Sequence, residues 1–554
     1  RSTTSDANLY LDNPNGIVMG EHASLDVNGA FHATTADYVT LADGQRIYAD
    51  ADQGVTLTVA APEAFGFLDA SVGKIQISGS QLRVAEGQAI SLVGGEIDIT
   101  SSPKSDAKLE AAGGRIDLVG VASAGKVKLT SNDITNTTAT NANISLTDST
   151  VTADNHTDSK TVGTIQLQGA DITVNNSRLQ ADNNSSVSAA GHSVELDATQ
   201  DIRFTGSQIT AIVNSSGKGG DVTLTAAGQV SFAGENDDSA SGIYVRTEST
   251  EDDAGAGGSV SIQAQDIEFA EGARISATTD GPGQGGAVSL QANRQIRLGP
   301  DILLSADTFG TGTAGDLQLQ TASLILDDAT ISSGSESVEA GAGSAGNLRI
   351  ITGETIELSG GSALTTESAN AGGGGIHIET RDRLHLQDSK ITTSVRGGIG
   401  QGGNIFIDPV FVILENSQIQ ANAYGGPGGN INLIADYLMY SGPTASEASS
   451  ALSTSGNIEV QAVAGDAGSL QVTDVPDPLD VTQWASAPCH LRRGRISRLI
   501  MAGYDAHPTP VDDLLSSLPL HTLRSELTTV PTSVVHQALH QLLAATDTTG
   551  CNRL

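Results

Sequence analysis

Aromatic side chains are scarce in this sequence. Its 554 residues include nine Phe, eight Tyr and a single Trp. A compact globular core of ordinary shape draws on more aromatic volume than this. The shortage argues against ordinary globular domains and favours an interior filled by aliphatic side chains.

Positive charge is also scarce. The chain has 28 Lys and Arg against 64 Asp and Glu, which gives a formal net charge of −36. Binding of nucleic acid needs clustered positive charge, so we expect no nucleic-acid partner. The one local basic cluster is short and is expected to be a solvated tail; it comprises Arg492, Arg493, Arg495 and Arg498.

Cysteines and long apolar runs are nearly missing as well. Cys489 and Cys551 are the two cysteines, and whether they pair as a disulfide in an oxidising compartment stays open. No run of eighteen apolar residues is present, so no membrane-spanning helix is predicted. Because the sequence opens with Arg1 instead of Met, we expect a trimmed N-terminus, and the lack of a signal peptide excludes nothing.

Glycine, in contrast, is abundant, with 64 residues, and it recurs at a regular spacing. A small residue or Gly, a second Gly and an alternating polar–apolar run repeat about every 28 residues, with one wider gap that holds an acidic insertion at 235–253. These glycine anchors are Gly163, Gly191, Gly220, Gly258, Gly286, Gly315, Gly346, Gly375, Gly403, Gly429 and Gly456.

Within each repeat the apolar residues alternate with a period of two. The repeat after Gly286 contains three short alternating runs, at 288–290, 296–298 and 302–306, followed by a loop rich in Gly and Thr. Three strands and one loop form one turn of a parallel β-helix, in which stacked turns bury a shared interior. Propellers, leucine-rich repeats and calcium-binding nonapeptide rolls fit the spacing and motifs less well. The predicted fold is all-β, a right-handed parallel β-helix with a small mixed C-terminal tail.

The repeats suggest three regions. The regular shaft is expected over 71–475. The turns between 70 and 160 are expected to be shorter or to lack the loop, because "GGEIDI" and "GGRIDL" lie only 19 residues apart. Residues 476–554 lose the glycine anchors and form an appended module that we expect to cap the shaft. This module contains an amphipathic helix-like segment, TSVVHQALHQLLAAT.

The first region, 1–70, contains a sharply specified turn, Asn13-Pro14-Asn15-Gly16. Pro14 presets φ for the second position of a β-turn, Asn13 can close an Asx-type hydrogen bond, and Gly16 tolerates the φ that follows. Alternating residues flank the turn on both sides, so the simplest interpretation is one hairpin turn among many.

The stretch around this turn also resembles a known family. Asn13, Pro14, Asn15, Gly16 and Ile17 match the NPNGI element of the secretion domain of filamentous-haemagglutinin-like exoproteins, the passengers of bacterial two-partner secretion. Close agreement covers about residues 8–48. Two features depart from the family: Met19 replaces the usual aromatic before a glycine, and a second upstream Asn-Pro element is missing. The resemblance implies export by an outer-membrane transporter partner that reads this region, in a Gram-negative-type bacterium.

Parallel β-helices also include polysaccharide lyases and hydrolases, which is the alternative class. A glycosidase needs two carboxylates about 5 to 10 Å apart. Neighbouring residues on a strand point to opposite faces, which argues against the adjacent pairs Asp237–Asp238, Asp252–Asp253 and Asp327–Asp328. The polygalacturonase motifs are absent and the single Trp484 lies beyond the shaft, so we predict no catalytic residues.

No metal or cofactor is predicted. His536 and His540 have an i, i+4 spacing that can bind zinc, but no HExxH motif accompanies them. His377 and His385 occupy different strands of one turn without a converging carboxylate cluster. We therefore expect an adhesin-like exoprotein, secreted or held at the cell surface, that binds cells or polysaccharide through its faces and loops. The long loops before Gly258, Gly315 and Gly346 are the expected contact surface.

Overall fold

The computed structural model describes residues 6–50, 60–130, 134–236, 239–339, 341–441, 452–454 and 456–462. These residues contain strands and turns but no helix. The chain divides into two compact units, Arg1–Leu470 and Gln471–Leu554, and all described residues belong to the first. The expected C-terminal module therefore lies outside the described residues, together with Cys489, Cys551, His536, His540 and the arginine cluster.

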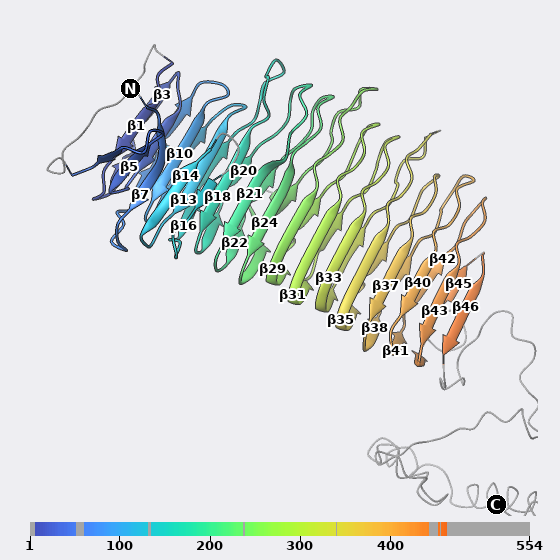
Figure 1. The fold of residues 1–554 in the computed structure, drawn as a ribbon. Helices are drawn as coiled ribbons and strands as arrows, with labels where there is room; N and C mark the ends of the chain where they lie inside the picture. The colour runs from blue at the N-terminus through green and yellow to red at the C-terminus, as the bar shows by residue number, and fades with distance from the viewer. Residues whose placement is uncertain are drawn as a thin grey trace, which may run out of the picture. The chain divides into compact units, whose positions relative to one another are not determined.

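The first unit is a parallel β-helix with three strands in each turn, which confirms the predicted fold class. Successive turns place their strands side by side, so the strands form three faces along the shaft (Figure 1). Faces 1 and 2 make up one 25-stranded sheet because four long strands, β29 (Val260–Phe269), β31 (Val288–Leu298), β33 (Leu317–Asp327) and β35 (Leu348–Ser359), belong to both.

The other strands are assigned to the faces as follows. Face 1 contains β1 (Leu9–Asp12), β4 (Phe31–Thr34), β10 (Ala89–Gly94), β13 (Arg115–Gly120), β18 (Thr164–Gly169), β21 (His192–Ala198), β24 (Asp221–Ala226), β37 (Ile376–Thr380), β40 (Ile405–Asp408), β43 (Ile431–Ala435) and β46 (Ile458–Ala462). Face 2 contains β2 (Ile17–Met19), β8 (Ile75–Ser78), β11 (Ile97–Thr100), β16 (Ile144–Thr147), β19 (Ile172–Asn175), β22 (Ile202–Thr205), β25 (Gln229–Ala233), β38 (Arg383–Gln387), β41 (Phe411–Glu415) and β44 (Tyr437–Ser441). Face 3 is a 14-stranded sheet with β3 (Ser24–Val27), β9 (Gln81–Val84), β12 (Ala107–Glu110), β17 (Ser149–Thr152), β20 (Arg178–Gln180), β23 (Gln208–Thr210), β28 (Gly242–Tyr244), β30 (Arg274–Ser276), β32 (Ile302–Ser305), β34 (Ala329–Ser332), β36 (Ala363–Thr365), β39 (Lys390–Thr392), β42 (Gln418–Ala421) and β45 (Leu452–Thr454).

Aliphatic columns fill the interior, as the alternation predicts. Val288, Ile296 and Leu304 point inward and are buried, and their counterparts above and below form one continuous core cluster. Identical positions stack at the strand spacing of about 4.8 Å, which suits aliphatic side chains. The bulkiest inward residues are Phe31, Phe204, Phe232 and Phe269. The rings of the last three stack, with centroids 4.6 and 5.1 Å apart.

Two features near the N-terminus differ from the prediction. One turn there does lack the long loop: Ile90 pairs with Ile116, 26 residues away, and only residues 111–114 connect face 3 to face 1. The next turn is longer than predicted, because Ile116 pairs with Ile165. The glycines at 95 and 114 precede strands of different faces, which explains their spacing of 19. The longer turn contains a hairpin, β14 (Gly125–Leu129) and β15 (Ile134–Asn136).

This hairpin joins a second sheet that the sequence analysis missed. Together with β5 (Tyr38–Leu41), β6 (Arg46–Tyr48) and β7 (Pro62–Phe67) it forms a 5-stranded antiparallel sheet, which we call the side sheet. Phe65, Phe67 and Val127 of the side sheet bury against Val93 and Val119 of face 1 in a separate small core. The N-terminal turns therefore have an outer layer that the shaft lacks.

The acidic insertion at 235–253 is likewise only partly a loop. A short hairpin, β26 (Glu235–Asn236) and β27 (Ser239–Ala240), projects between faces 2 and 3. The residues after it form β28, an ordinary strand of face 3. Asp252 and Asp253 are exposed in the following loop, and Asp237 and Asp238 lie outside the described residues.

The glycine anchors mark the corner where each turn enters face 1, and there the backbones of neighbouring turns touch. A Cβ on Gly258, Gly286, Gly315 or Gly346 would overlap the carbonyl oxygen of the anchor one turn earlier. In the next turn this position is Gly374, because Leu348 pairs with Ile376. The predicted anchor, Gly375, is therefore one residue too late.

We expect Gly374→Ala to destabilise the shaft by about 3 kcal/mol, because the new methyl group must displace the Gly346 backbone. Gly375→Ala is the matched control. Its methyl group would first meet a side-chain oxygen, Asn347 Oδ1, at 3.3 Å, and should cost under about 1 kcal/mol. Urea unfolding of both variants, followed by circular dichroism, measures the difference. Equal stability of the two variants would contradict the backbone-contact explanation.

Candidate functional site

The Asn13–Gly16 turn has the predicted local geometry. Gly16 N donates to Asn13 O at 3.0 Å, Asn15 N donates to Asn13 Oδ1 at 3.2 Å, and Asn13 Nδ2 donates back to Gly16 O at 2.9 Å. Gly16 has φ +111°, which disfavours any residue with a Cβ. Asn13 thus closes the turn from both sides.

The turn is a corner of the β-helix and not a hairpin, so the simplest sequence interpretation is wrong. The strands it joins do not pair with each other: β1 pairs with β4 on face 1, and β2 pairs with β8 on face 2. Ile17 N donates to Lys74 O at 2.9 Å, and a Cβ on Gly73 would overlap the backbone of Pro14. The Asn13–Gly16 corner is therefore held by direct backbone contact with the next turn.

The side chains of the turn divide between core and solvent. Ile17 is buried and pairs with Ile75 in the interior column, whereas the Asn13 and Asn15 side chains are exposed. The strands on either side expose apolar side chains, and Val18 is 76% exposed. This corner presents polar amides on a rigid backbone.

The turn lies at an open end of the sheets. In the described part of the chain β1, β2 and β3 each pair on one side only, so their outer backbone groups have no strand partner. An unpaired strand edge is a template for another strand. We call these three strands the N-terminal edge.

Behind this edge, a groove of about 880 Å³ runs between the side sheet and the loops that lead into face 1. His32 and Gln166 line this groove, and they are the ends of an outward row of face 1 in which His32, Ser91, Asp117 and Gln166 follow one another in register. Burial and the Arg115 charge lower the pKa of His32 to about 4, and burial raises the pKa of Asp117. The row is a buried polar layer beneath the side sheet.

The row contains Ser, His and Asp, but in an order that does not suit nucleophilic catalysis. A catalytic serine needs a histidine as its base, oriented by the carboxylate. Here Ser91 Oγ donates directly to Asp117 Oδ2 at 2.9 Å, and Arg115 Nε also binds that carboxylate at 2.9 Å. These hydrogen bonds hold neighbouring strands of face 1 together, and this structural role accounts for the three residues without any catalytic role.

The other residues considered for catalysis or metal binding do not converge either. Asp327 and Asp328 are successive residues at a corner, where Asp328 has φ +51° and is exposed. His377 Nε2 hydrogen-bonds Glu379, and His385 Nε2 lies 3.6 Å from Glu415, on separate faces. No group of three metal-ligating side chains occurs among the residues that the structure describes. This part of the chain also contains no helix that is long and apolar enough to cross a membrane.

The long loops stack along one edge of the shaft, as the sequence predicts. They follow face 3, and residues at their base form a ladder of parallel bridges that includes Thr247, Thr279, Thr308 and Ser335. Large apolar side chains stand out from these loops. They are Phe309, Val338, Ile399 and Tyr424, with exposed fractions of 50%, 72%, 87% and 84%. We call these four residues and their loops the loop ridge.

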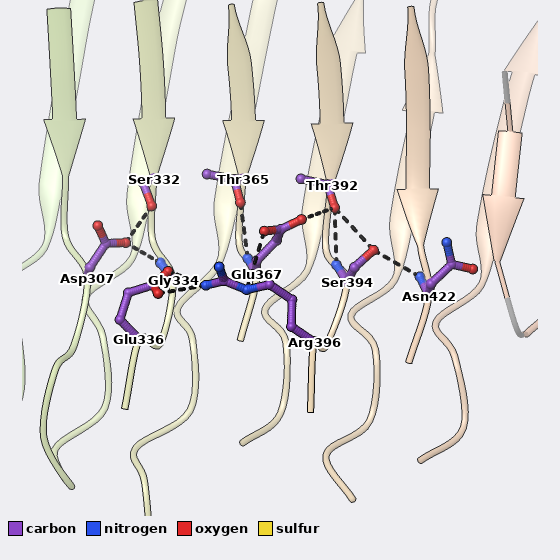
Figure 2. Close-up of polar contacts among 10 residues, drawn as sticks. All are labelled: Asp307, Ser332, Gly334, Glu336, Thr365, Glu367, Thr392, Ser394, Arg396 and Asn422. Carbon is purple, nitrogen blue, oxygen red and sulfur yellow. Dashed lines mark hydrogen bonds and ion pairs between the residues drawn. The ribbon is translucent and has the colours of Figure 1, made fainter. Parts of the chain in front are cut away.

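Figure 2 shows a polar network that fixes the base of the loop ridge. Asp307 Oδ1 accepts from Ser332 Oγ at 2.5 Å, and it also accepts from Gly334 N. Further along, Thr392 Oγ1 donates to Glu367 Oε1 at 2.7 Å. Because each bond joins neighbouring turns, the network orders the loops before any ligand arrives.

One ion pair in the network extends further. Arg396 Nη2 lies 2.6 Å from both carboxylate oxygens of Glu336, two turns away, and bridges past the intervening Glu367. This pair, in which one nitrogen contacts both carboxylate oxygens, is half-exposed, and its contribution to stability is modest. Its geometric effect is to align three successive loops.

Comparison with known proteins identifies the N-terminal part of the chain. Residues 2–162 match the family described as TPS secretion domain. This range includes the Asn13–Gly16 corner, the N-terminal edge and the whole side sheet. No curated protein and no solved structure matches the chain. With its secretion domain at the start of a parallel β-helix, the chain is a filamentous-haemagglutinin-like exoprotein of two-partner secretion, exported across the outer membrane of Gram-negative bacteria by a transporter partner.

Proposed function

We propose that this exoprotein is an adhesin, which binds cells or polysaccharide through its β-helix and remains at the cell surface or is released. The observation that carries the proposal is the loop ridge, where four large apolar side chains stand exposed on loops that a polar network holds in place. Exposed apolar side chains on an ordered surface mark sites of interaction.

We also assign the Asn13–Ile17 corner the role of the element that the transporter reads. The support is its position: it carries exposed Asn13 and Asn15 amides, is anchored by Ile17, and borders the N-terminal edge. A rigid first turn can also template the folding of the turns behind it, since each turn gains stability from its neighbour.

A β-helical lyase or hydrolase is the alternative function. It requires carboxylates that converge in a groove, and the aspartate pairs in the described residues do not converge. The adhesin proposal needs no such arrangement, and it agrees better with a family of secreted exoproteins.

The purified protein should make coated beads adhere to cells and should release no sugar from a panel of polysaccharides. Replacing Phe309, Val338, Ile399 and Tyr424 by Ser should remove most of the adherence, because the exposed apolar contacts are lost. The matched control replaces Tyr437 and Met439 by Ser. These two side chains are 43% and 47% exposed on face 2, outside the loop ridge, and their replacement should leave adherence unchanged. Adherence that survives the ridge substitutions, or steady sugar release, would overturn the proposal.

A further inference from the structure

A second groove, of about 1130 Å³, lies on the outer surface of face 3. Its floor is made by β20, β23, β28 and β30, where Arg178, Gln208, Gly242 and Arg274 occupy one row in register. Three strand spacings of about 4.8 Å separate Arg178 from Arg274, so their Cα atoms are about 14 Å apart. The groove follows the long axis of the shaft.

The β26–β27 hairpin forms one wall of this groove, and two floor residues fasten it. Tyr244 OH donates to Ala240 O at 2.9 Å, and Gln208 Nε2 donates to the same oxygen at 3.1 Å. The extra residues of the acidic insertion therefore create a wall at this one turn, beside the arginines. Gly242 lets the floor strands pack closely, because a Cβ at this position would overlap the backbone of Arg274.

The groove gathers three arginine side chains, although the chain as a whole has a net charge of −36. Most described arginines form an ion pair with an Asp or Glu side chain. Arg178 and Arg274 are exposed and form no ion pair with a described residue. Arg246 binds Glu248 at 2.8 Å, yet its buried Nε has no hydrogen-bond partner in the described part of the chain. Three guanidinium groups in this groove thus have donors that no described residue uses.

The acidic residues of the groove lie on its wall and rim, and the exposed Glu235 of β26 belongs to the wall. Glu271 and Asp301 stand at the corners between faces 2 and 3 and are exposed. Asp182 lies within the groove, but its Oδ1 already accepts from Ile212 N at 2.8 Å. A bound chain that runs along the floor would meet the arginines first and the rim carboxylates at its side.

We propose that the face 3 groove binds a polysaccharide that carries carboxylate groups along its chain. An arginine fork matches a carboxylate with two parallel hydrogen bonds, and the ring of Tyr244 offers an apolar surface beside it. The elongated floor suits a linear polymer better than a compact ligand. This inference rests on the proposed adhesin function and names the ligand class of one site.

The test uses the full chain and polygalacturonate, with its fully methyl-esterified form as the neutral control. In titration calorimetry we expect polygalacturonate to bind, added salt to weaken binding, and the ester to show none. Arg178→Gln with Arg274→Gln should reduce affinity at least tenfold, whereas Glu271→Gln should increase it by removing a rim charge. The matched control, Arg294→Gln with Arg297→Gln, removes two charges from another part of the surface and should change nothing.

Several results would overturn the proposal: equal binding of the ester, unchanged affinity of the Arg178/Arg274 variant, or no binding of polygalacturonate at all. Binding of a sulfated dextran in place of polygalacturonate would also overturn it, since the assigned chemistry is carboxylate. The bead assay separates this inference from the adhesin function. If beads still adhere while polygalacturonate does not bind, the groove assignment fails alone; loss of adherence by the unmodified protein refutes the function itself.

Discussion

Replacing Ile275 by Asp should unfold the middle of the shaft under conditions in which the unmodified protein is stable. Ile275 lies on β30 and is completely buried between Ile243 of the previous turn and Leu304 of the next. An ionised carboxylate at this position has no partner, and an uncompensated buried charge costs about 3 to 5 kcal/mol or more. In a β-helix each turn is stabilised by its two neighbours, so the defect weakens both interfaces.

The control is Ser276→Asp, which adds the same carboxylate at the next residue of the same strand. Ser276 points outward and is half-buried, so the new charge can reach water and should cost under about 1 kcal/mol. Urea unfolding followed by circular dichroism compares the two. If the Ile275 and Ser276 variants unfold at the same urea concentration, the assignment of Ile275 to the interior is wrong.

Ile275 also illustrates what the sequence could predict. Its inward position follows from the period-two alternation of Ala273, Ile275 and Ala277, all of which are fully buried. Such a pattern is reliable because a shift of one residue would expose every apolar side chain. The three strands of each turn and the stacking of the loops follow from the same repetition.

The features that were missed depend on contacts outside the repeat. The side sheet pairs residues near 40, 65 and 127, and no period connects these positions. One signal was available: Tyr38–Leu41 and Arg46–Tyr48 are alternating runs on either side of an Asp-Gly pair, which is typical of a hairpin. The anchor at Gly374 was misplaced for another reason, since four consecutive glycines offer no local choice between them.

In the candidate sites, too, the features set by local sequence could be predicted, and the features set by contacts between distant residues could not. The local geometry of the Asn13–Gly16 turn follows from its residue types, but its role as a corner depends on pairing with distant strands, β4 and β8. The face 3 groove could not be predicted from the spacing of Arg178 and Arg274, because the β26–β27 hairpin interrupts the repeat between them. An insertion of this kind interrupts the regular spacing of the repeats, and it also forms a surface feature that the other turns do not have.

The largest functional effect is expected from removing the start of the secretion domain. Residues 8–40 contain the first turn of the β-helix, including the Asn13–Ile17 corner, and the first strands of face 1. Without them the exposed end of the sheets moves to β8 and β9, and the exposed amides of Asn13 and Asn15 are lost. We expect the remaining shaft to reach the periplasm and to stay there, because the transporter partner no longer finds its recognition region.

The control for this deletion removes residues 288–316, one complete turn of the shaft. Val288 and Leu317 occupy equivalent positions in neighbouring turns, so the repeat continues across the junction. A β-helix tolerates the loss of one turn because each turn contacts only its neighbours. This shorter protein keeps the whole matched secretion domain and should be exported.

The most direct test of the account is a secretion assay in a Gram-negative bacterium. The full chain, the 8–40 deletion and the 288–316 deletion are each expressed behind a signal peptide together with the transporter partner, and the protein in the periplasm, on the cell surface and in the medium is quantified. We predict that the full chain and the 288–316 deletion reach the surface or medium, whereas the 8–40 deletion accumulates in the periplasm. Export of the 8–40 deletion at the yield of the full chain would contradict the assignment of this protein's N-terminal region to two-partner secretion.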